Sequence, residues 1–216
     1  MIRKFKDFIW LLLRKMNLGG AVQLMLKSAL LDDGWFKSFN EKRSIDKNGN
    51  PIPWNTYPFI KFIEPRLKNT FRIFEYGSGN STIWYSKRVE SIVAVENDKN
   101  WFEIVKTGLP ENANIIYRDL SYSGDYCREV LNQKEQFHII IIDGRDRVNS
   151  VKNSLEKLTS GGVIIFDNSE LVQYTEAMEF MQKKGFKRID FSGISPITAH
   201  NTSTSIFYRS ENCLGI

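Results

Sequence analysis

The sequence contains little cysteine, and its two cysteines form no ligand pattern. Cys127 and Cys213 lie far apart among 216 residues, and neither belongs to a Cys-x-x-Cys or Cys/His spacing. A zinc site and a disulfide framework are therefore both disfavoured. The sequence also lacks long repeats and low-complexity tracts. Its composition, 42% hydrophobic and 25% charged, is typical of a soluble globular protein with a packed core.

Positively charged residues are in excess, but they are not concentrated in one long basic tract. The 30 Lys and Arg residues outnumber the 25 Asp and Glu residues, which gives a net charge of +5 and a pI near 9.1. Because this excess is modest and dispersed, nucleic acid is disfavoured as a partner.

An apolar run near the N-terminus, Phe8–Leu13, has basic residues on both sides. It is shorter than the roughly 20 apolar residues of a membrane-spanning helix, and no convincing signal-peptide cleavage site follows it. We therefore predict a cytoplasmic protein. Residues 1–16 have two interpretations: a helix that docks on the domain, or a basic amphipathic helix that contacts the inner face of the membrane peripherally. The side chains that would dock are Phe5, Ile9, Leu12 and Leu13.

The chain is predicted to have two parts, a helical extension with a flap loop (residues 1–56) and one domain (residues 57–216). Two short helices are expected within Ile2–Leu31, separated by paired glycines. The polar, turn-rich stretch Asp32–Asn55 predicts the flap loop. Helical spacing of apolar residues predicts another helix after Pro58.

Beyond Phe71, short β-rich runs alternate with helical patterns, which predicts a doubly wound α/β fold with a mostly parallel sheet. Two nearly continuous apolar runs, His138–Ile142 and Val163–Phe166, are typical of central strands covered on both faces. The predicted strands are Phe71–Tyr76, Ile92–Glu96, Asn114–Arg118, Phe137–Asp143, Gly162–Asp167, Phe186–Phe191 and Thr204–Arg209. The predicted helices begin near Asn80, Lys99, Ser123 and Arg147, and one more spans Glu170–Lys184.

Glycines follow the first predicted strand, at the edge where ligands bind in open parallel sheets. The turn Gly77-Ser78-Gly79 would let the backbone pass close to a ligand, because glycine has no side chain and tolerates positive φ. The next residues open a helix whose free N–H groups point towards a polar ligand. Glu96 ends the second strand, where a carboxylate accepts hydrogen bonds from the ribose of an adenosine-containing cofactor.

A dinucleotide-binding reductase would share these features, but its fingerprint has a third glycine where this sequence has Thr82. The segment instead resembles the first motif of class I S-adenosylmethionine-dependent methyltransferases. This resemblance covers about Phe71–Arg209 and implies an antiparallel last strand in a seven-stranded sheet. It places Glu75 near the amino acid moiety of S-adenosylmethionine, Glu96 at the ribose and Asp119 at the adenine. The cofactor-binding residues that it implies are Glu75, Tyr76, Gly77, Ser78, Gly79, Asn80, Ser81, Thr82, Glu96, Asn97, Asp119, Leu120 and Asp143.

A second polar group follows the fourth and fifth strands. Asp143, Asp167 and Asn168 would lie close together, because adjacent parallel strands end at the same edge, and their oxygens suit a cation such as Mg²⁺ or Ca²⁺. This group is similar to the metal site of catechol and caffeoyl-coenzyme A O-methyltransferases, in which the metal orients the acceptor oxygen. Alternatively, the two aspartates hydrogen-bond the substrate or cap the next helix.

The sequence does not identify the residue that acts as the general base. Three residues after the fourth-strand aspartate, those enzymes carry a catalytic lysine, whereas this sequence has Asp146. Candidates for catalysis besides Asp143 are Arg145, Asp146 and His200. We favour His200 as proton acceptor, since histidine can be neutral near pH 7, although a loop histidine without a special role explains it equally well. His138 opens a buried strand and is given a structural role.

Aromatic residues gather around the predicted flap: Trp35, Phe36, Trp54 and Tyr57. They would cover the cofactor, stack on a sugar or ring substrate, or pack the extension against the sheet. No Asn-Pro-Pro-Tyr-like motif, which positions exocyclic amines, follows the fourth strand, and this favours an oxygen acceptor.

Several segments, including Glu211–Ile216, look like a bacterial family of methyltransferase-like proteins that supplies no acceptor. We predict O-methylation of a small molecule or a saccharide intermediate. Two other classes stay open: an NAD(P)-dependent reductase with a Rossmann-like sheet, and a non-catalytic membrane-associated adaptor that retains the fold.

Overall fold

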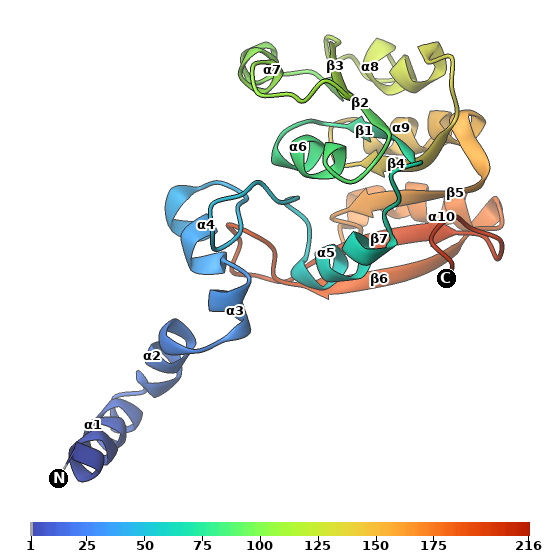
Figure 1. Cartoon of the computed structure of the whole chain (residues 1–216). Helices are drawn as coiled ribbons and strands as arrows, with labels where there is room; N and C mark the ends of the chain where they lie inside the picture. Colours follow the sequence, from blue (N-terminus) through green and yellow to red (C-terminus); the bar gives the residue numbers. More distant parts are fainter. Residues whose placement is uncertain (1) are drawn as a thin grey trace.

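A seven-stranded sheet in the order β3-β2-β1-β4-β5-β7-β6 forms the centre of the molecule (Figure 1). The computed structural model describes residues 2–216; Met1, where the predicted segments 1–16 and 1–56 begin, lies outside the described residues. Strands β1 to β5 pair in parallel, and β7 runs antiparallel to both of its neighbours. The doubly wound α/β fold and the antiparallel last strand are thus confirmed. The strands are β1 (Arg72–Tyr76), β2 (Ser91–Glu96), β3 (Ala113–Tyr117), β4 (Phe137–Ile142), β5 (Leu158–Asp167), β6 (Lys187–Gly193) and β7 (Thr202–Tyr208).

Helices begin at or near the predicted residues, except that the helix predicted from Glu170 begins at Thr175. Asp98 caps one of them, because its carboxylate accepts a hydrogen bond from the Trp101 amide at 3.0 Å. The helix predicted near Ser123 begins two residues later and is short. The helices of the domain are α5 (Tyr57–Ile63), α6 (Asn80–Ser86), α7 (Lys99–Lys106), α8 (Asp125–Arg128), α9 (Arg147–Ser154) and α10 (Thr175–Lys183), with short 3-10 turns after α5, α8 and α9 and before α10.

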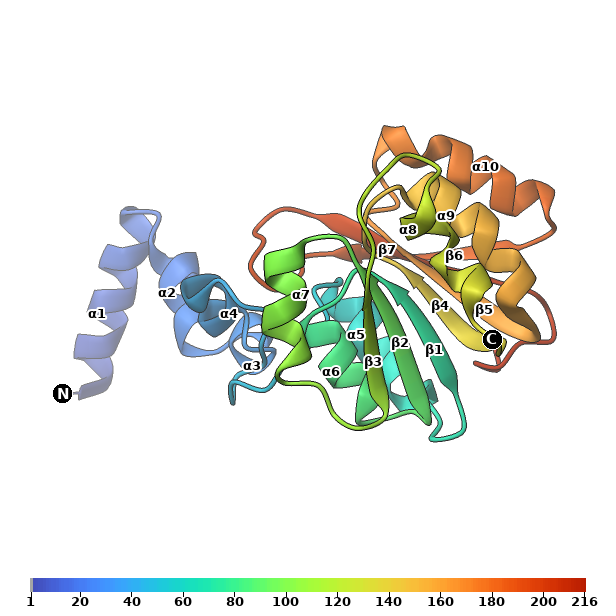
Figure 2. The same cartoon turned by 90° about the horizontal axis from the view of Figure 1, so that it is seen from above.

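Side chains of the central strand β4 alternate between two cores. Ile139 and Ile141 pack with α5 and α6 on one face of the sheet. Ile140 and Ile142 pack with α8, α9 and α10 on the other face (Figure 2). Each of these isoleucines is at most 1% exposed. Burial on both faces explains why this strand is a continuous apolar run.

Helix α4 (Trp35–Glu41) lies inside the stretch predicted to be a flap loop, which corrects that prediction. Ser38 is buried in this helix; its hydroxyl donates to the Ile45 carbonyl oxygen at 2.5 Å and accepts from the Ile45 amide at 3.0 Å. Trp35 donates its indole N–H to the Thr198 carbonyl oxygen at 2.7 Å. The polar composition hid the helix, because Thr198, the partner of Trp35, is 163 residues away in the sequence.

Helices α1 (Ile2–Lys15), α2 (Gly19–Leu26) and α3 (Ala29–Asp32) form an N-terminal arm that projects from the domain (Figures 1 and 2). The interpretation in which α1 docks on the domain is contradicted, because Phe5, Ile9 and Leu12 are 65%, 40% and 49% exposed. Within residues 2–216, no helix has the length and apolar character needed to cross a membrane.

Candidate active site

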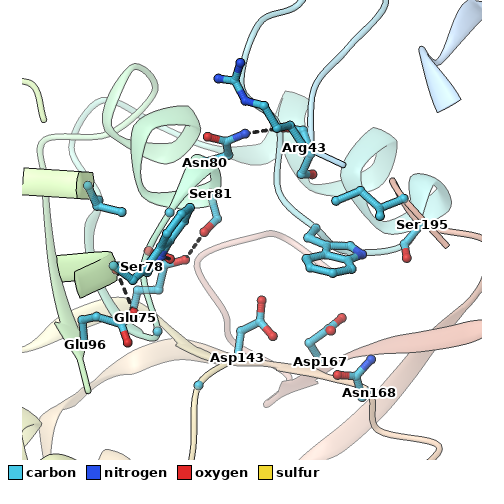
Figure 3. Close-up of a pocket in the computed structure, with 18 of the residues that line it drawn as sticks. Arg43, Glu75, Ser78, Asn80, Ser81, Glu96, Asp143, Asp167, Asn168 and Ser195 are labelled. Atoms are coloured by element: carbon cyan, nitrogen blue, oxygen red, sulfur yellow. Dashed lines mark hydrogen bonds between the residues drawn. The ribbon is translucent and has the colours of Figure 1, made fainter. Parts of the chain in front are cut away.

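A cavity of about 940 Å³ lies beyond the carboxyl ends of β1, β2, β4 and β5 (Figure 3). This is the edge at which doubly wound sheets bind ligands, and the volume suits a small molecule. The flap contributes Lys42, Arg43, Ser44 and Trp54 to its lining. The loop between β6 and β7 contributes Ser195, Ile197, Thr198 and His200. The cavity is therefore enclosed by segments from both ends of the chain.

The glycine turn brings the backbone of β1 close to the end of β4. Gly77 has φ +90°, and a Cβ atom there would lie 3.3 Å from the backbone carbon and oxygen of Asp143. Gly79 has φ +155°, and a Cβ atom there would lie 3.4 Å from the ring of Trp101. Trp101 also donates its indole N–H to the Ser78 carbonyl oxygen at 2.8 Å. A side chain at either glycine would alter the cavity wall.

Glu75 is buried beneath this turn and holds the start of α6. Its two carboxylate oxygens accept hydrogen bonds from the hydroxyls of Ser81 and Thr82, each at 2.5 Å. Thr82 in turn accepts from the Gly79 amide at 3.0 Å. Burial raises the pKa of Glu75 to about 7, although the two hydroxyls oppose this rise. Glu75 also lines the cavity, so a cationic ligand group there would favour its ionised form.

Glu96 ends β2 on the other side of the turn, and it too lines the cavity. One carboxylate oxygen accepts from the amides of Asn97 and Asp98 at 2.7 and 2.9 Å. The other accepts from the Ser78 hydroxyl at 2.9 Å. These bonds fix the carboxylate against the glycine turn, as Figure 3 shows. An oxygen with only one protein donor retains capacity for a further donor, such as a sugar hydroxyl.

Asp143 and Asp167 lie side by side at the ends of β4 and β5 (Figure 3). Burial and the nearby carboxylate of Asp167 raise the pKa of Asp143 well above its usual range, and burial also raises the pKa of Asp167. The guanidinium of Arg147 opposes both effects. The pair therefore holds a proton more readily than isolated aspartates do.

Arg147 occupies the position between these strand ends that the sequence suggested for a metal ion. It donates to Asp143 Oδ1 at 3.1 Å and to Asn168 Oδ1 at 3.2 Å, and also to the Asp167 carbonyl oxygen. Asp167 Oδ1 accepts from the Asn55 side chain at 2.8 Å and from the Thr204 hydroxyl at 2.6 Å.

One side-chain oxygen of each predicted ligand residue is thus already engaged by a protein donor, and the donor to Asp143 and Asn168 is itself a cation. A divalent ion bound here would face the guanidinium charge directly. Among the residues described, no group of three or more His, Cys, Asp or Glu side chains is arranged to hold a metal. In this arrangement, Arg147 and a divalent ion would compete for the oxygens of Asp143 and Asn168.

The structure brings most of the predicted cofactor residues to the cavity: Glu75, Gly77, Ser78, Gly79, Asn80, Ser81, Glu96, Asn97 and Asp143 line it. Tyr76 and Thr82 are fully buried beside it; the Tyr76 hydroxyl donates to the Cys127 carbonyl oxygen at 2.8 Å. Asp119 lies outside the lining and accepts from the Tyr117 hydroxyl at 2.6 Å. Leu120 borders a smaller, separate pocket.

Of the four candidate catalytic residues, three line the cavity and one borders the smaller pocket. Asp143, Arg145 and His200 line the cavity, the last two as exposed residues of its rim. Asp146 borders the smaller pocket and accepts hydrogen bonds from the Ser123 amide at 2.8 Å and from the Asn149 side chain at 2.7 Å. These bonds give Asp146 a role in holding the loop that precedes α8.

Several lining residues were not predicted. Trp101, Arg147 and Ser195 fall in this group, as do the flap residues Lys42 and Arg43. A signal was available for Arg147, which begins a helix directly after the strand-end sequence Asp-Gly-Arg-Asp. Of the aromatic residues predicted around the flap, Trp54 lines the cavity and is 50% exposed.

Strand order and the antiparallel β7 are those of a class I methyltransferase fold, with the glycine turn and the Glu96 carboxylate lining one cavity. Residues 74–169 match a family model described as a methyltransferase domain. Residues 74–169 are therefore a methyltransferase domain, and the chain is a methyltransferase with the class I strand order. No curated protein sequence matches it.

Solved structures show the same fold at low identity. A precorrin-6y C5,15-methyltransferase from Geobacter metallireducens GS-15 is 16% identical with a TM-score of 0.60, over 80% of this chain and 96% of that one. An O-methyltransferase from Bacillus cereus in complex with SAH is 16% identical with a TM-score of 0.56, over 85% and 92%. An rRNA methylase from Streptococcus thermophilus is 13% identical with a TM-score of 0.52, over 70% and 96%. Their differing acceptors mean that the fold alone does not identify the acceptor.

Proposed function

We propose that this enzyme methylates a hydroxyl oxygen of a small molecule, with saccharide intermediates among the acceptors. The observation that carries the proposal is one cavity with two different ends. At one end lie the glycine turn and the Glu96 carboxylate, which suit the cofactor. At the other end, Trp54 and the hydroxyls of Ser195 and Thr198 offer an aromatic surface and hydrogen-bonding groups, which suit a hydroxylated ring.

We assign the cofactor end by chemistry. Glu96 would accept hydrogen bonds from the ribose hydroxyls, because its carboxylate is held beside the turn by Ser78 and the Asn97 amide. The turn itself and the first residues of α6 pass beside the methionine part, where Glu75 offers a carboxylate to a positive charge. S-adenosylmethionine, when bound, supplies a methyl group on a positively charged sulfur. The acceptor oxygen attacks that methyl group, and its proton must pass to a base.

Asp143 is the base that we propose. It lines the cavity, lies against the glycine turn and has a pKa raised by burial and by Asp167. Arg147 orients its carboxylate through the 3.1 Å hydrogen bond and so acts as a positioning residue. His200, on the exposed rim, is the alternative. No step requires a divalent ion, because Arg147 supplies a fixed positive charge between the strand ends.

The test is methyl transfer from labelled S-adenosylmethionine to a panel of hydroxylated and amine acceptors. Transfer to hydroxyl groups supports the proposal, and transfer only to amines or to RNA contradicts it. With an acceptor in hand, Asp143→Asn is expected to lower kcat about 100-fold or more, the usual effect of removing a general base. Glu179→Gln, an exposed carboxylate change on α10, is the matched control and should leave kcat unchanged.

If instead His200→Gln removes activity while Asp143→Asn retains it, the base is His200. Addition of a chelator is expected to leave the rate unchanged. A rate that falls with chelator and recovers with Mg²⁺ would restore the metal site suggested by the sequence.

A further inference from the structure

The arm helix α1 has an apolar face that no part of the domain covers. Phe5, Phe8, Ile9 and Leu12 follow the i, i+3, i+4, i+7 spacing of one helix face. Their exposed fractions are 65%, 61%, 40% and 49%. Figures 1 and 2 show α1 at the far end of the arm, away from the sheet. Large apolar side chains exposed together on one helix face indicate an interaction surface.

Positive charge borders this face. Helix α1 carries five basic residues and a single acidic residue, Asp7. At 3.6 residues per turn, Arg3 and Arg14 lie opposite the apolar face, and the remaining basic residues lie along its borders. The basic residues are Arg3, Lys4, Lys6, Arg14 and Lys15.

We infer that α1 binds an anionic lipid bilayer and lies parallel to its surface, with the Phe5 and Leu12 face in the acyl boundary. A helix with one aromatic and aliphatic face that is bordered by lysine side chains is suited to this position. A second copy of the chain is a poorer occupant, because pairing two apolar faces would bring two strongly positive helices together. Anionic headgroups instead neutralise that charge.

The next helix extends the apolar surface of the arm. Leu24, Met25 and Leu26 at the end of α2 are 45%, 64% and 66% exposed. A close turn joins the two helices, since a Cβ atom at Gly19 would lie 3.2 Å from the Arg14 side chain. The chain then continues through α3 and α4 to the flap residues of the cavity. Binding of the arm would thus hold the active site near the membrane surface.

The experiment is sedimentation of the full chain with phosphatidylcholine vesicles and with vesicles that also contain phosphatidylserine. We expect binding chiefly to the anionic vesicles, and release at high salt, where screening shortens the reach of the charges. Each basic side chain near such a surface contributes about 1 kcal/mol, or about fivefold. The variant Lys6→Gln/Lys15→Gln, which removes two charges on the borders of the apolar face, should therefore bind about 25-fold more weakly.

Two further variants test the apolar face. Phe8→Asp/Leu12→Asp should abolish vesicle binding, and Leu171→Asp/Val172→Asp, the same charge change at sites on the domain that are 42% and 86% exposed, should not. Phe8→Ala/Leu12→Ala retains good helix formers and should still weaken binding at least tenfold, which separates loss of contact from loss of helix. Absence of binding by the wild type contradicts the inference. So does a dimer that Phe8→Asp/Leu12→Asp dissociates while vesicles bind neither form. These readouts are independent of methyl transfer.

Discussion

The buried carboxyl of Glu75 makes the stability of the protein depend on pH in a direction opposite to that of most acids. Its pKa rises from an ordinary value of 4.5 to about 7 on folding, because the side chain is 1% exposed. Between these two values the folded state holds a proton that the unfolded chain has released. The free energy of unfolding must therefore fall as pH rises through this window.

The size of this effect follows from the two pKa values. At about 1.4 kcal/mol per pH unit, the gap between 4.5 and about 7 corresponds to a loss of about 3 kcal/mol by pH 8. Glu75→Gln removes the titrating group and retains one acceptor for the Ser81 and Thr82 hydroxyls. Relative to the wild type, the variant should gain about 2.5 kcal/mol of stability between pH 5 and pH 8.

Urea unfolding followed by tryptophan fluorescence at several pH values measures this difference. A constant difference in the free energy of unfolding between the two proteins does not affect the test, because the prediction concerns only how that difference changes with pH. Glu179→Gln on α10 serves as the control and should follow the wild type. Parallel stability curves for the wild type and Glu75→Gln would refute the reasoning. Binding of the positively charged cofactor should also release protons near pH 7, and titrations in buffers of different ionisation enthalpy detect this release.

Four further results are expected. Gly77→Ala should destabilise the protein by about 1–2 kcal/mol in chemical unfolding, because φ is +90° and the new Cβ would meet the Asp143 backbone at 3.3 Å. Arg147→Met should cost about 1–3 kcal/mol, since it removes the donor to Asp143, whose side chain is 24% exposed, and to Asn168. Asp146→Ala should lower stability by about 1–3 kcal/mol through the unpaired Ser123 amide, with unchanged cofactor affinity by calorimetry. With Asp143 as base, kcat should rise with pH through the raised pKa of Asp143, and Asp143→Asn should lose this rise.

Local patterns predicted the sheet well, because each strand is a short apolar run and burial on both faces leaves little ambiguity. Gly77 and Glu96 were found in the same way, since a strand-end glycine and a strand-end carboxylate have a defined place in a doubly wound sheet. The strand bounds differ from the predicted ones by one or two residues at most ends. The start of β5 is four residues earlier, at Leu158.

The features that were missed depend on contacts between distant segments. Helix α4 is held by the pairing of Trp35 with Thr198, which no local spacing shows. The oxygens of Asp143 and Asn168 were assigned to a metal because their type and position permit it. Sequence could not show that Arg147, the first residue of the next helix, would donate hydrogen bonds to both.

The central claim is that the cavity binds S-adenosylmethionine against the glycine turn and the Glu96 carboxylate. Calorimetric titration with S-adenosylhomocysteine tests it most directly. The wild type should bind one molecule per chain, Glu179→Gln should bind equally, and Glu96→Gln should bind at least tenfold more weakly. Absence of binding by the folded wild type, or equal binding by Glu96→Gln, would contradict the claim.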